Sequence, residues 1–223
     1  MHGLRGKYRV SVIVVAVSFM LLPGCQREES NKPEGWQQTA TVTPNKDIPL
    51  TNESAYVSVL RKLKEDPNDL EAIYHLGDLY YRDGKYEKAV VNFRRVLEQE
   101  PERGYLYLKL GTALNRLQRY PEALDAFEKA IAHLQDPTVA YNNMGITYGK
   151  LGRYQEEIEA MEKAIKLRPR YASARYNLGV TLIKVGNLEG ARQQYQALNE
   201  FDLTMAQALL EEIEKAAPEA GKR

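Results

Sequence analysis

The sequence predicts an all-α protein in which antiparallel helix pairs stack into a solenoid, and two observations support this fold class. Glycine recurs with a period of 34 residues, at Gly77, Gly111, Gly145 and Gly179. Around each glycine, large apolar residues recur at steps of three and four residues, which is the periodicity of an α-helix. One helix pair cannot bury its own apolar face, so the units are expected to stack on one another.

The first repeat shows how each helix pair is built. The apolar pattern predicts one helix over 70–81 and a second over 87–98. Gly84 lies between them and can adopt the left-handed conformation that ends a helix. The equivalent residues of the later repeats are Gln118, Gly152 and Gly186. Prolines follow the second helices, where the missing N–H and the ring stop helix propagation: Pro67, Pro101, Pro137 and Pro169.

Three further positions recur with each glycine. A large apolar residue follows it by three places, as Tyr80, Leu114, Tyr148 and Leu182. Twelve places on come Ala89, Ala123, Glu157 and Ala191, and sixteen places on come Phe93, Phe127, Met161 and Tyr195. This alternation of large and small residues resembles the tetratricopeptide repeat, a helix–turn–helix unit of 34 residues. The resemblance covers residues 52–216 and implies a right-handed α-solenoid of about four repeats, over 70–103, 104–137, 138–171 and 172–203.

Two additional helices are expected to cap the array of repeats. Residues 52–67 have the pattern of a second repeat helix and form the N-terminal capping helix. Asp202 or Thr204 can start a C-terminal capping helix over 204–217. The apolar residues of that helix share one face: Ala206, Leu209, Leu210 and Ile213. Residues 218–223 are expected to form a disordered tail.

Residues 1–24 have the features of a secretory signal peptide. Basic residues precede an uncharged run over 10–22, and this run is followed by Pro23 and Gly24. A basic region, a short apolar core and a small residue before the cleavage site are typical of exported chains. The apolar run is shorter than the roughly 20 residues that a transmembrane helix needs.

The only cysteine, Cys25, directly follows the expected cleavage site. The segment Leu22-Pro23-Gly24-Cys25 resembles the lipobox of bacterial lipoproteins, although Pro23 departs from the usual residue at its place. The resemblance implies that Cys25 receives a diacylglycerol, becomes the mature N-terminus and anchors the protein in the lipid bilayer. The alternative is an uncleaved anchor with an incidental cysteine. Residues 25–51 are polar, contain three prolines and lack periodicity, so we expect a flexible tether.

Composition and motifs argue against several classes of function. A formal net charge of +1 gives no global field for nucleic acid. The sequence contains no metal-ligand spacing, glycine-rich phosphate loop or nucleophile motif. Glutamate pairs such as Glu156-Glu157 and Glu211-Glu212 are expected on solvated helix surfaces. We therefore predict a binding protein rather than an enzyme, with no cofactor, metal, nucleic acid or small-molecule substrate.

In the tetratricopeptide repeat family, six positions of each first helix line a concave groove that binds a peptide or a helix. The resemblance implies that these residues line the groove here: Tyr74, Asp78, Tyr81, Tyr105, Lys109, Asn142, Asn143, Tyr176 and Asn177. Asparagine amides can pair with both the N–H and the C=O of a ligand backbone. Leu108 and Thr112 stand where a carboxylate clamp has its lysine and asparagine, so this clamp is not expected.

A column of cations occupies one groove position in the four repeats: Arg82, Arg116, Lys150 and Lys184. It is compatible with an acidic ligand, and also with the favourable effect of a cation at the end of a helix.

Together these observations predict a membrane-tethered scaffold or adaptor for protein–protein interactions in the bacterial cell envelope. Its partner is expected to be a protein or peptide in the groove. If the organism is Gram-negative, Gln26 after the cysteine favours the outer membrane, facing the periplasm. The alternative is a non-catalytic subunit or assembly factor of an envelope enzyme, export or pilus complex.

Overall fold

The computed structural model describes residues 52–220, and side chains over 54–217. The expected signal peptide, the lipidation site Cys25 and the tether lie outside the described residues, as do residues 221–223. The described part of the chain contains ten helices and no strand. The first is α1, Asn52–Glu65, and the others are α2 (Leu70–Arg82), α3 (Tyr86–Gln99), α4 (Gly104–Arg116), α5 (Tyr120–His133), α6 (Thr138–Lys150), α7 (Tyr154–Leu167), α8 (Ala172–Lys184), α9 (Leu188–Asn199) and α10 (Leu203–Ala220).

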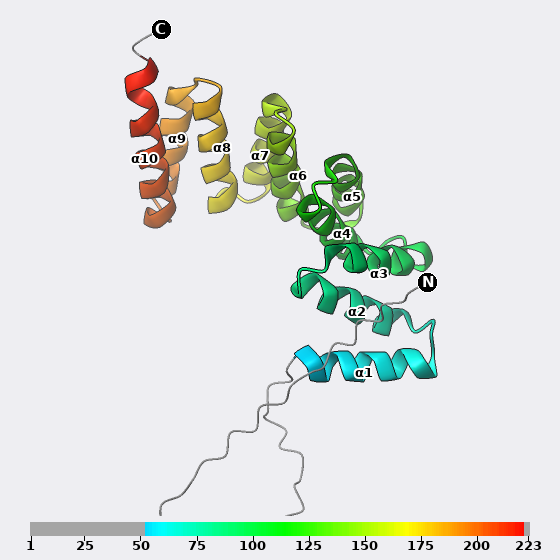
Figure 1. Cartoon of the computed structure of the whole chain (residues 1–223). Coiled ribbons are helices and arrows are strands. Elements are labelled where there is room, and N and C mark those ends of the chain that lie inside the picture. Colours follow the sequence, from blue (N-terminus) through cyan, green and yellow to red (C-terminus); the bar gives the residue numbers. More distant parts are fainter. Residues whose placement is uncertain (1–51, 221–223) are drawn as a thin grey trace, which may run out of the picture. The chain divides into compact units, whose positions relative to one another are not determined.

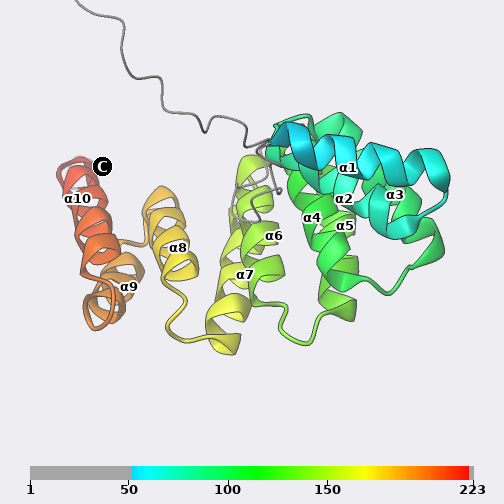
Figure 2. The ribbon, with the colours of Figure 1, turned by 90° about the horizontal axis from the view of Figure 1, so that it is seen from below.

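The helices pack in chain order, each against the next (Figures 1 and 2). The pairs α2–α3, α4–α5, α6–α7 and α8–α9 are the four repeats, and α1 packs on α2. Beyond these neighbour contacts, α4 touches α6 and α6 touches α8. The first helices of successive repeats therefore form one layer, which is the arrangement expected of a tetratricopeptide solenoid. None of the described helices is long and apolar enough to cross a membrane.

The turn inside each repeat depends on a residue in the left-handed backbone conformation. Gly84, Gly152 and Gly186 have φ angles of 74°, 72° and 84°, so the expected role of these glycines is confirmed. The second repeat makes the same turn with Gln118 at φ 59°. A side chain is strained in this conformation, and the strain is tolerated because the helices on both sides fix the turn.

Each recurring glycine lies where two helices approach closely. A Cβ atom on Gly77 would lie 2.8 Å from the Phe93 ring, and one on Gly111 would lie 2.6 Å from the Phe127 ring. Both rings are fully buried. In the fourth repeat the residue opposite Gly179 is Leu209 of α10, at 2.5 Å from the hypothetical Cβ. The terminal helix thus supplies a core side chain that the second helix supplies in earlier repeats.

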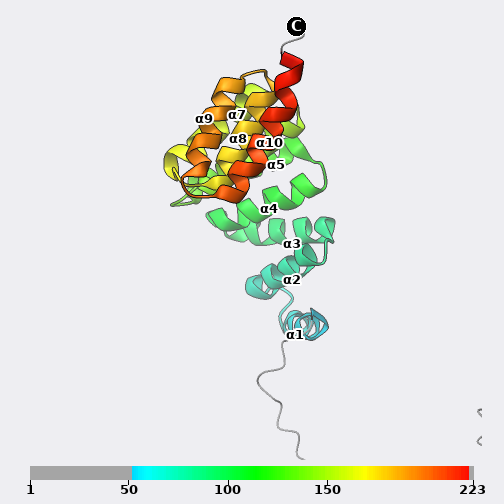
Figure 3. The same cartoon turned by 90° about the vertical axis from the view of Figure 1, so that its left-hand side faces the viewer.

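The C-terminal helix is longer than the sequence predicts. Asp202 is its N-cap, because its Oδ1 accepts a hydrogen bond of 3.0 Å from the backbone N–H of Met205. The helix continues to Ala220, so the expectation of a disordered tail is wrong for residues 218–220. It lies beside α8 and α9 (Figures 1 and 3). Of the predicted apolar face, Leu209 is fully buried whereas Leu210 is only partly buried.

Candidate peptide-binding groove

The expected groove residues lie on the layer formed by α2, α4, α6 and α8, and they form two separate clusters. The first cluster comes from α2 and α4: Tyr74, Asp78, Tyr81, Tyr105 and Lys109. The second comes from α6 and α8: Asn142, Asn143, Tyr176 and Asn177. The two clusters differ in how much of their polar surface is available to a ligand.

Lys109 is at the centre of the first cluster. Its ammonium forms an ion pair with Asp78 and lies 5.4–6.0 Å from the ring centroids of three tyrosines, namely Tyr74, Tyr81 and Tyr105. Burial alone would lower the pKa of Lys109, but the hydrogen bond and charge of Asp78 raise it overall. The Lys109 side chain is only 18% exposed, whereas Tyr105 is 58% exposed. A ligand would therefore contact this tyrosine before the lysine.

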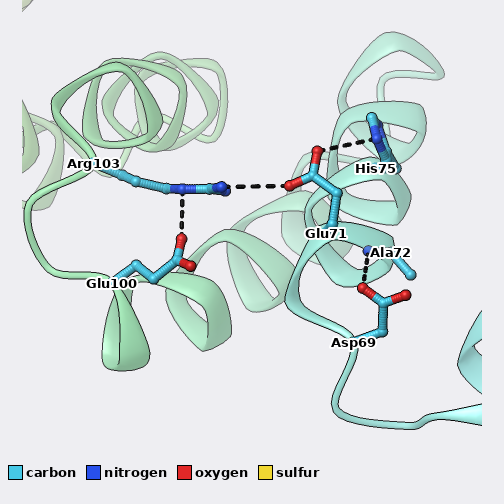
Figure 4. Close-up of polar contacts among 6 residues, drawn as sticks. All are labelled: Asp69, Glu71, Ala72, His75, Glu100 and Arg103. Atoms are coloured by element: carbon cyan, nitrogen blue, oxygen red, sulfur yellow. Dashed lines mark hydrogen bonds and ion pairs between the residues drawn. The ribbon is translucent and has the colours of Figure 1, made fainter.

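Arg103, the N-cap residue of α4, links α2 to the end of α3 beside this cluster (Figure 4). The Arg103 side chain lies 2.5 Å from the Glu100 carboxylate and 3.3 Å from that of Glu71. Glu71 also lies 3.2 Å from Nε2 of His75 in the same helix. The Arg103 guanidinium is 5.7 Å from the Tyr74 ring centroid. These contacts hold α2 and α4 in register at one end of the groove, where a pocket of about 380 Å³ opens beside Tyr74 and Arg103.

The second cluster is a chain of amides across two repeats. Asn177 Nδ2 donates a hydrogen bond of 3.3 Å to Asn142 Oδ1, and Asn142 Nδ2 donates one of 3.3 Å to Asn143 Oδ1. Asn142 is buried at 5% exposure, so its amide holds the repeats together rather than facing a ligand. Asn143 and Asn177 are partly exposed, and each of them lines a pocket.

Two further pockets lie along the layer of first helices. One, of about 290 Å³, lies between α4 and α6 and is lined by Asn143. The other, of about 350 Å³, lies between α6 and α8 and is lined by Asn177 and Tyr176. Ile146 and Lys150 line both pockets, so the two are adjacent parts of one groove. The cations of the predicted column are exposed, and three of them line these pockets: Arg116, Lys150 and Lys184. Arg82 of α2 lies 3.2 Å from the Asp78 carboxylate instead.

Glu157 departs from the sequence-based expectation of a solvated surface. Its side chain is buried at 5% exposure and lines the pocket between α6 and α8. Burial raises the pKa of this carboxyl, and interactions with Thr181 and Lys184 only partly oppose the effect. The adjacent Glu156 behaves as expected, because it is partly exposed and its carboxylate lies 2.8 Å from Arg153.

The sequence did carry a signal for Glu157. At this repeat position the other three repeats have alanine, and each of these alanines is fully buried. A charged residue at a position that is buried alanine in the other repeats indicates that the third repeat packs differently here. The compensating change is Gly149, since the equivalent residues of the other repeats are larger: Tyr81, Asn115 and Ile183. Within residues 54–217, no group of three acidic, histidine or cysteine side chains could hold a metal ion.

Comparison with known proteins assigns the repeats to a family. Three family models described as tetratricopeptide repeats match residues 74–137, 139–171 and 160–193. Together they cover more than half of the chain. A search of curated proteins finds no significant match to the chain.

Solved structures share the fold. The crystal structure of MamA is 26% identical with a TM-score of 0.63, over 75% of this chain and 91% of MamA. That of PilW, a widely conserved type IV pilus biogenesis factor, is 24% identical with a TM-score of 0.63, over 76% and 82% of the two chains. YrrB, a tetratricopeptide repeat protein with an unusual peptide-binding site, is 20% identical with a TM-score of 0.57, over 72% and 93%. The repeat period, the helix order and the family matches agree, and the chain belongs to the tetratricopeptide repeat family.

Proposed function

We propose that this protein is a membrane-tethered adaptor of the bacterial cell envelope that binds a peptide or helix of its partner in the groove formed by α2, α4, α6 and α8. Tetratricopeptide repeats are typically non-catalytic modules for protein–protein interaction, and the same fold carries a peptide-binding site in YrrB. The single observation that carries the proposal for this chain is the pair of adjacent pockets that Ile146 and Lys150 join into one groove.

The chemistry of the groove suits a segment of polypeptide better than a small compact ligand. Its N-terminal part offers tyrosine rings, whose faces bind apolar or cationic groups. Its C-terminal part offers the amides of Asn143 and Asn177, which can bind the backbone of a ligand. Because these features are spread over several repeats, one ligand must extend along the helices to contact them all.

The tether is proposed from the sequence, because Cys25 and the segment around it lie outside the described residues. A signal peptide followed by a lipobox-like cysteine supports export and lipid attachment. A polar segment of about 26 residues would span roughly 28 Å on average as a flexible coil. This arrangement places the groove within reach of other envelope proteins, in the outer membrane facing the periplasm if the organism is Gram-negative.

The groove can be tested with a library of random peptides selected on the purified soluble domain. We expect wild-type protein to select peptides, and the variant Asn143→Ala/Tyr176→Ala to lose them while its helical circular dichroism is retained. The matched control is Val91→Ala, because Val91 is 67% exposed on α3 and lies outside the groove. Selected peptides that bind the groove variant as tightly as wild type would move the interface to another face.

A further inference from the structure

A buried acidic side chain without a full set of partners lies in the groove between α6 and α8. Oε2 of Glu157 is buried and has no hydrogen-bond partner among the described residues. Removing an ionised carboxylate from water is unfavourable unless donors replace the lost hydration. Oε2 of Glu157 therefore lacks a hydrogen-bond donor. Glu157 lines a pocket that opens on the proposed ligand groove.

The preceding repeat fills the equivalent space with an asparagine side chain. There, Asn115 Nδ2 donates a hydrogen bond of 2.9 Å to the hydroxyl of Thr147, which itself donates to the Asn143 carbonyl at 2.7 Å. In the next repeat the hydroxyl of Thr181 donates to the Asn177 carbonyl at 3.0 Å in the same way. The residue that corresponds to Asn115 is now a glycine, so the amide donor is missing.

Gly149 and Glu157 are a matched pair at this junction. A Cβ atom on Gly149 would lie 2.5 Å from Glu157 Oε2 and 2.7 Å from Oε1. Any side chain at position 149 would therefore collide with the carboxylate. The missing side chain gives the carboxylate of α7 room to reach between α6 and α8 toward the pocket.

The pocket has the size and the lining to accept one long side chain. Its volume is about 350 Å³, and its lining includes Tyr176 and Glu212. The Glu212 carboxylate already pairs with Lys215 at 2.9 Å, so Glu157 is the carboxylate that lacks a partner. An aromatic face beside carboxylates favours a cation. Lys150 and Lys184 also line the pocket, but both are exposed and neither donates a hydrogen bond to Oε2 of Glu157. The ammonium of Lys184 lies 5.8 Å from the Tyr154 ring centroid instead.

We propose that this pocket binds the cationic side chain of a lysine or arginine in the peptide that occupies the groove, and that Glu157 is the residue that determines this specificity. The inference rests on the proposed peptide-binding function. A cationic donor gives a carboxylate a charge-assisted hydrogen bond, which is about twice as strong as a neutral one. The bound side chain would supply the donor that Asn115 supplies in the preceding repeat.

Two intramolecular arrangements compete with this proposal. In the first, Lys184 turns inward and neutralises Glu157. In the second, Glu157 stays protonated and donates a hydrogen bond to the Thr181 hydroxyl. Neither arrangement gives the groove a preference for basic ligands, so the sequence of the bound peptide separates them from the proposal.

The experiment uses peptides selected from the random library on the wild-type domain. We expect lysine or arginine at one fixed position of the selected peptides. Replacing that residue with norleucine should weaken binding at least about tenfold, since an interfacial charge pair commonly contributes more than this factor. Fluorescence anisotropy with labelled peptides measures both dissociation constants.

Three variants assign the effect to the carboxylate. Glu157→Gln keeps the shape of the side chain, and it should bind the basic and norleucine peptides with similar affinity. Glu156→Gln is the matched control: it removes the same charge one residue away, outside the pocket, and should keep the wild-type preference. Gly149→Asn/Glu157→Ala rebuilds the amide and alanine of the preceding repeat, so packing is preserved and the preference should also be lost.

The outcomes separate this inference from the proposed function. Peptides selected without a fixed basic residue, or a preference for basic peptides that Glu157→Gln retains, overturn the inference and leave the groove as a peptide-binding site. Failure of the wild-type domain to select any peptide overturns both. A preference that disappears in Glu157→Gln and in the double variant, but persists in Glu156→Gln, supports the proposal.

Discussion

At the scale of single residues, the junction between the third and fourth repeats shows how one substitution requires another. An alanine at this position of α7 would leave space for a larger residue on α6, as in the other repeats. Glu157 takes that space only because Gly149 has no side chain. The combination of Gly149 and Glu157 fills the same space but introduces a buried carboxyl group. Burial raises the pKa of this carboxyl, so it is harder to ionise.

The raised pKa of Glu157 predicts how the stability of the variant Glu157→Gln depends on pH. A carboxyl with a raised folded-state pKa stabilises the fold when it is protonated at low pH, and this contribution is lost as pH rises through the folded-state pKa. Glutamine cannot ionise, so the variant should have a larger free energy of unfolding than wild type at pH 8. The difference should shrink below about pH 4, where the wild-type carboxyl is protonated in both states.

Urea unfolding of both proteins at several pH values measures this difference. Glu156→Gln is the control, because its carboxylate pairs with Arg153 and its pKa is lowered rather than raised. This control should show no gain in stability at pH 8. An equal free energy of unfolding for Glu157→Gln and wild type across the whole pH range would contradict the burial of an ionisable carboxyl.

At the scale of elements, the helix pairs depend on their turns and on the helix that ends the array. In three repeats the turn uses glycine in the left-handed conformation. In the second repeat Gln118 adopts this conformation, at φ 59°. The last repeat depends on α10, which places Leu209 against Gly179. Both features can be tested by changing one side chain.

Replacing Gln118 with glycine should stabilise the protein. The left-handed conformation costs a side chain about 1–2 kcal/mol relative to glycine, and the greater entropy of glycine in the unfolded chain offsets about 0.4–1 kcal/mol of this. We therefore expect a net gain of about 0–1.6 kcal/mol in the free energy of unfolding measured with urea. Gln193→Gly is the matched control, because Gln193 is exposed within α9, where glycine should cost about 1 kcal/mol. A loss of stability in both variants would argue that the turn is not strained.

The variant Leu209→Ala should destabilise the protein by about 2–5 kcal/mol, because it leaves a cavity in a closely packed core. Leu209 is fully buried, whereas Leu210 beside it on α10 is only partly buried. The variant Leu210→Ala should therefore cost clearly less, which makes it the control for the same change in volume and helix propensity. Similar melting temperatures for wild type and Leu209→Ala would mean that α10 is a loosely attached segment.

At the scale of the whole molecule, a different polar contact joins the first helices at each junction between repeats. An ion pair between Asp78 and Lys109 joins α2 to α4. The hydrogen bond between Asn115 and Thr147 joins α4 to α6, and the amides of α6 and α8 join the last two repeats. In a solenoid each repeat is stabilised mainly by its neighbours. Substitutions at one junction are therefore expected to act locally on the adjacent repeats.

The proposed anchor is a property of the whole chain, and we expect lipid on Cys25. Metabolic labelling with a fatty acid should mark wild-type protein in the membrane fraction and fail to mark Cys25→Ser. Ser30→Ala, a change of similar size nearby in the sequence, should be labelled like wild type. Label that persists in Cys25→Ser, or a mature N-terminus at another residue, would contradict the lipoprotein proposal.

The sequence by itself determined the all-helical fold and the positions of the repeats. The 34-residue period, the turn residues such as Gly84 and the prolines after the second helices act within a few residues of one another, so a local pattern is enough to locate the helices. It also indicated which groove positions come together on α2 and α4, because these positions repeat with the same period.

The tertiary structure decided which polar residues are buried and which side chains complete the core. Asn142 has a groove position in the sequence but is buried, because amides of its own and the next repeat surround it. Glu157 lies in a polar stretch of its helix but is buried, because Gly149 leaves it room. Leu209 packs on a glycine 30 residues earlier in the chain. Burial depends on atoms that are distant in sequence and near in space. The repeat pattern could mark position 157 as exceptional, but it could not show which atoms surround the side chain.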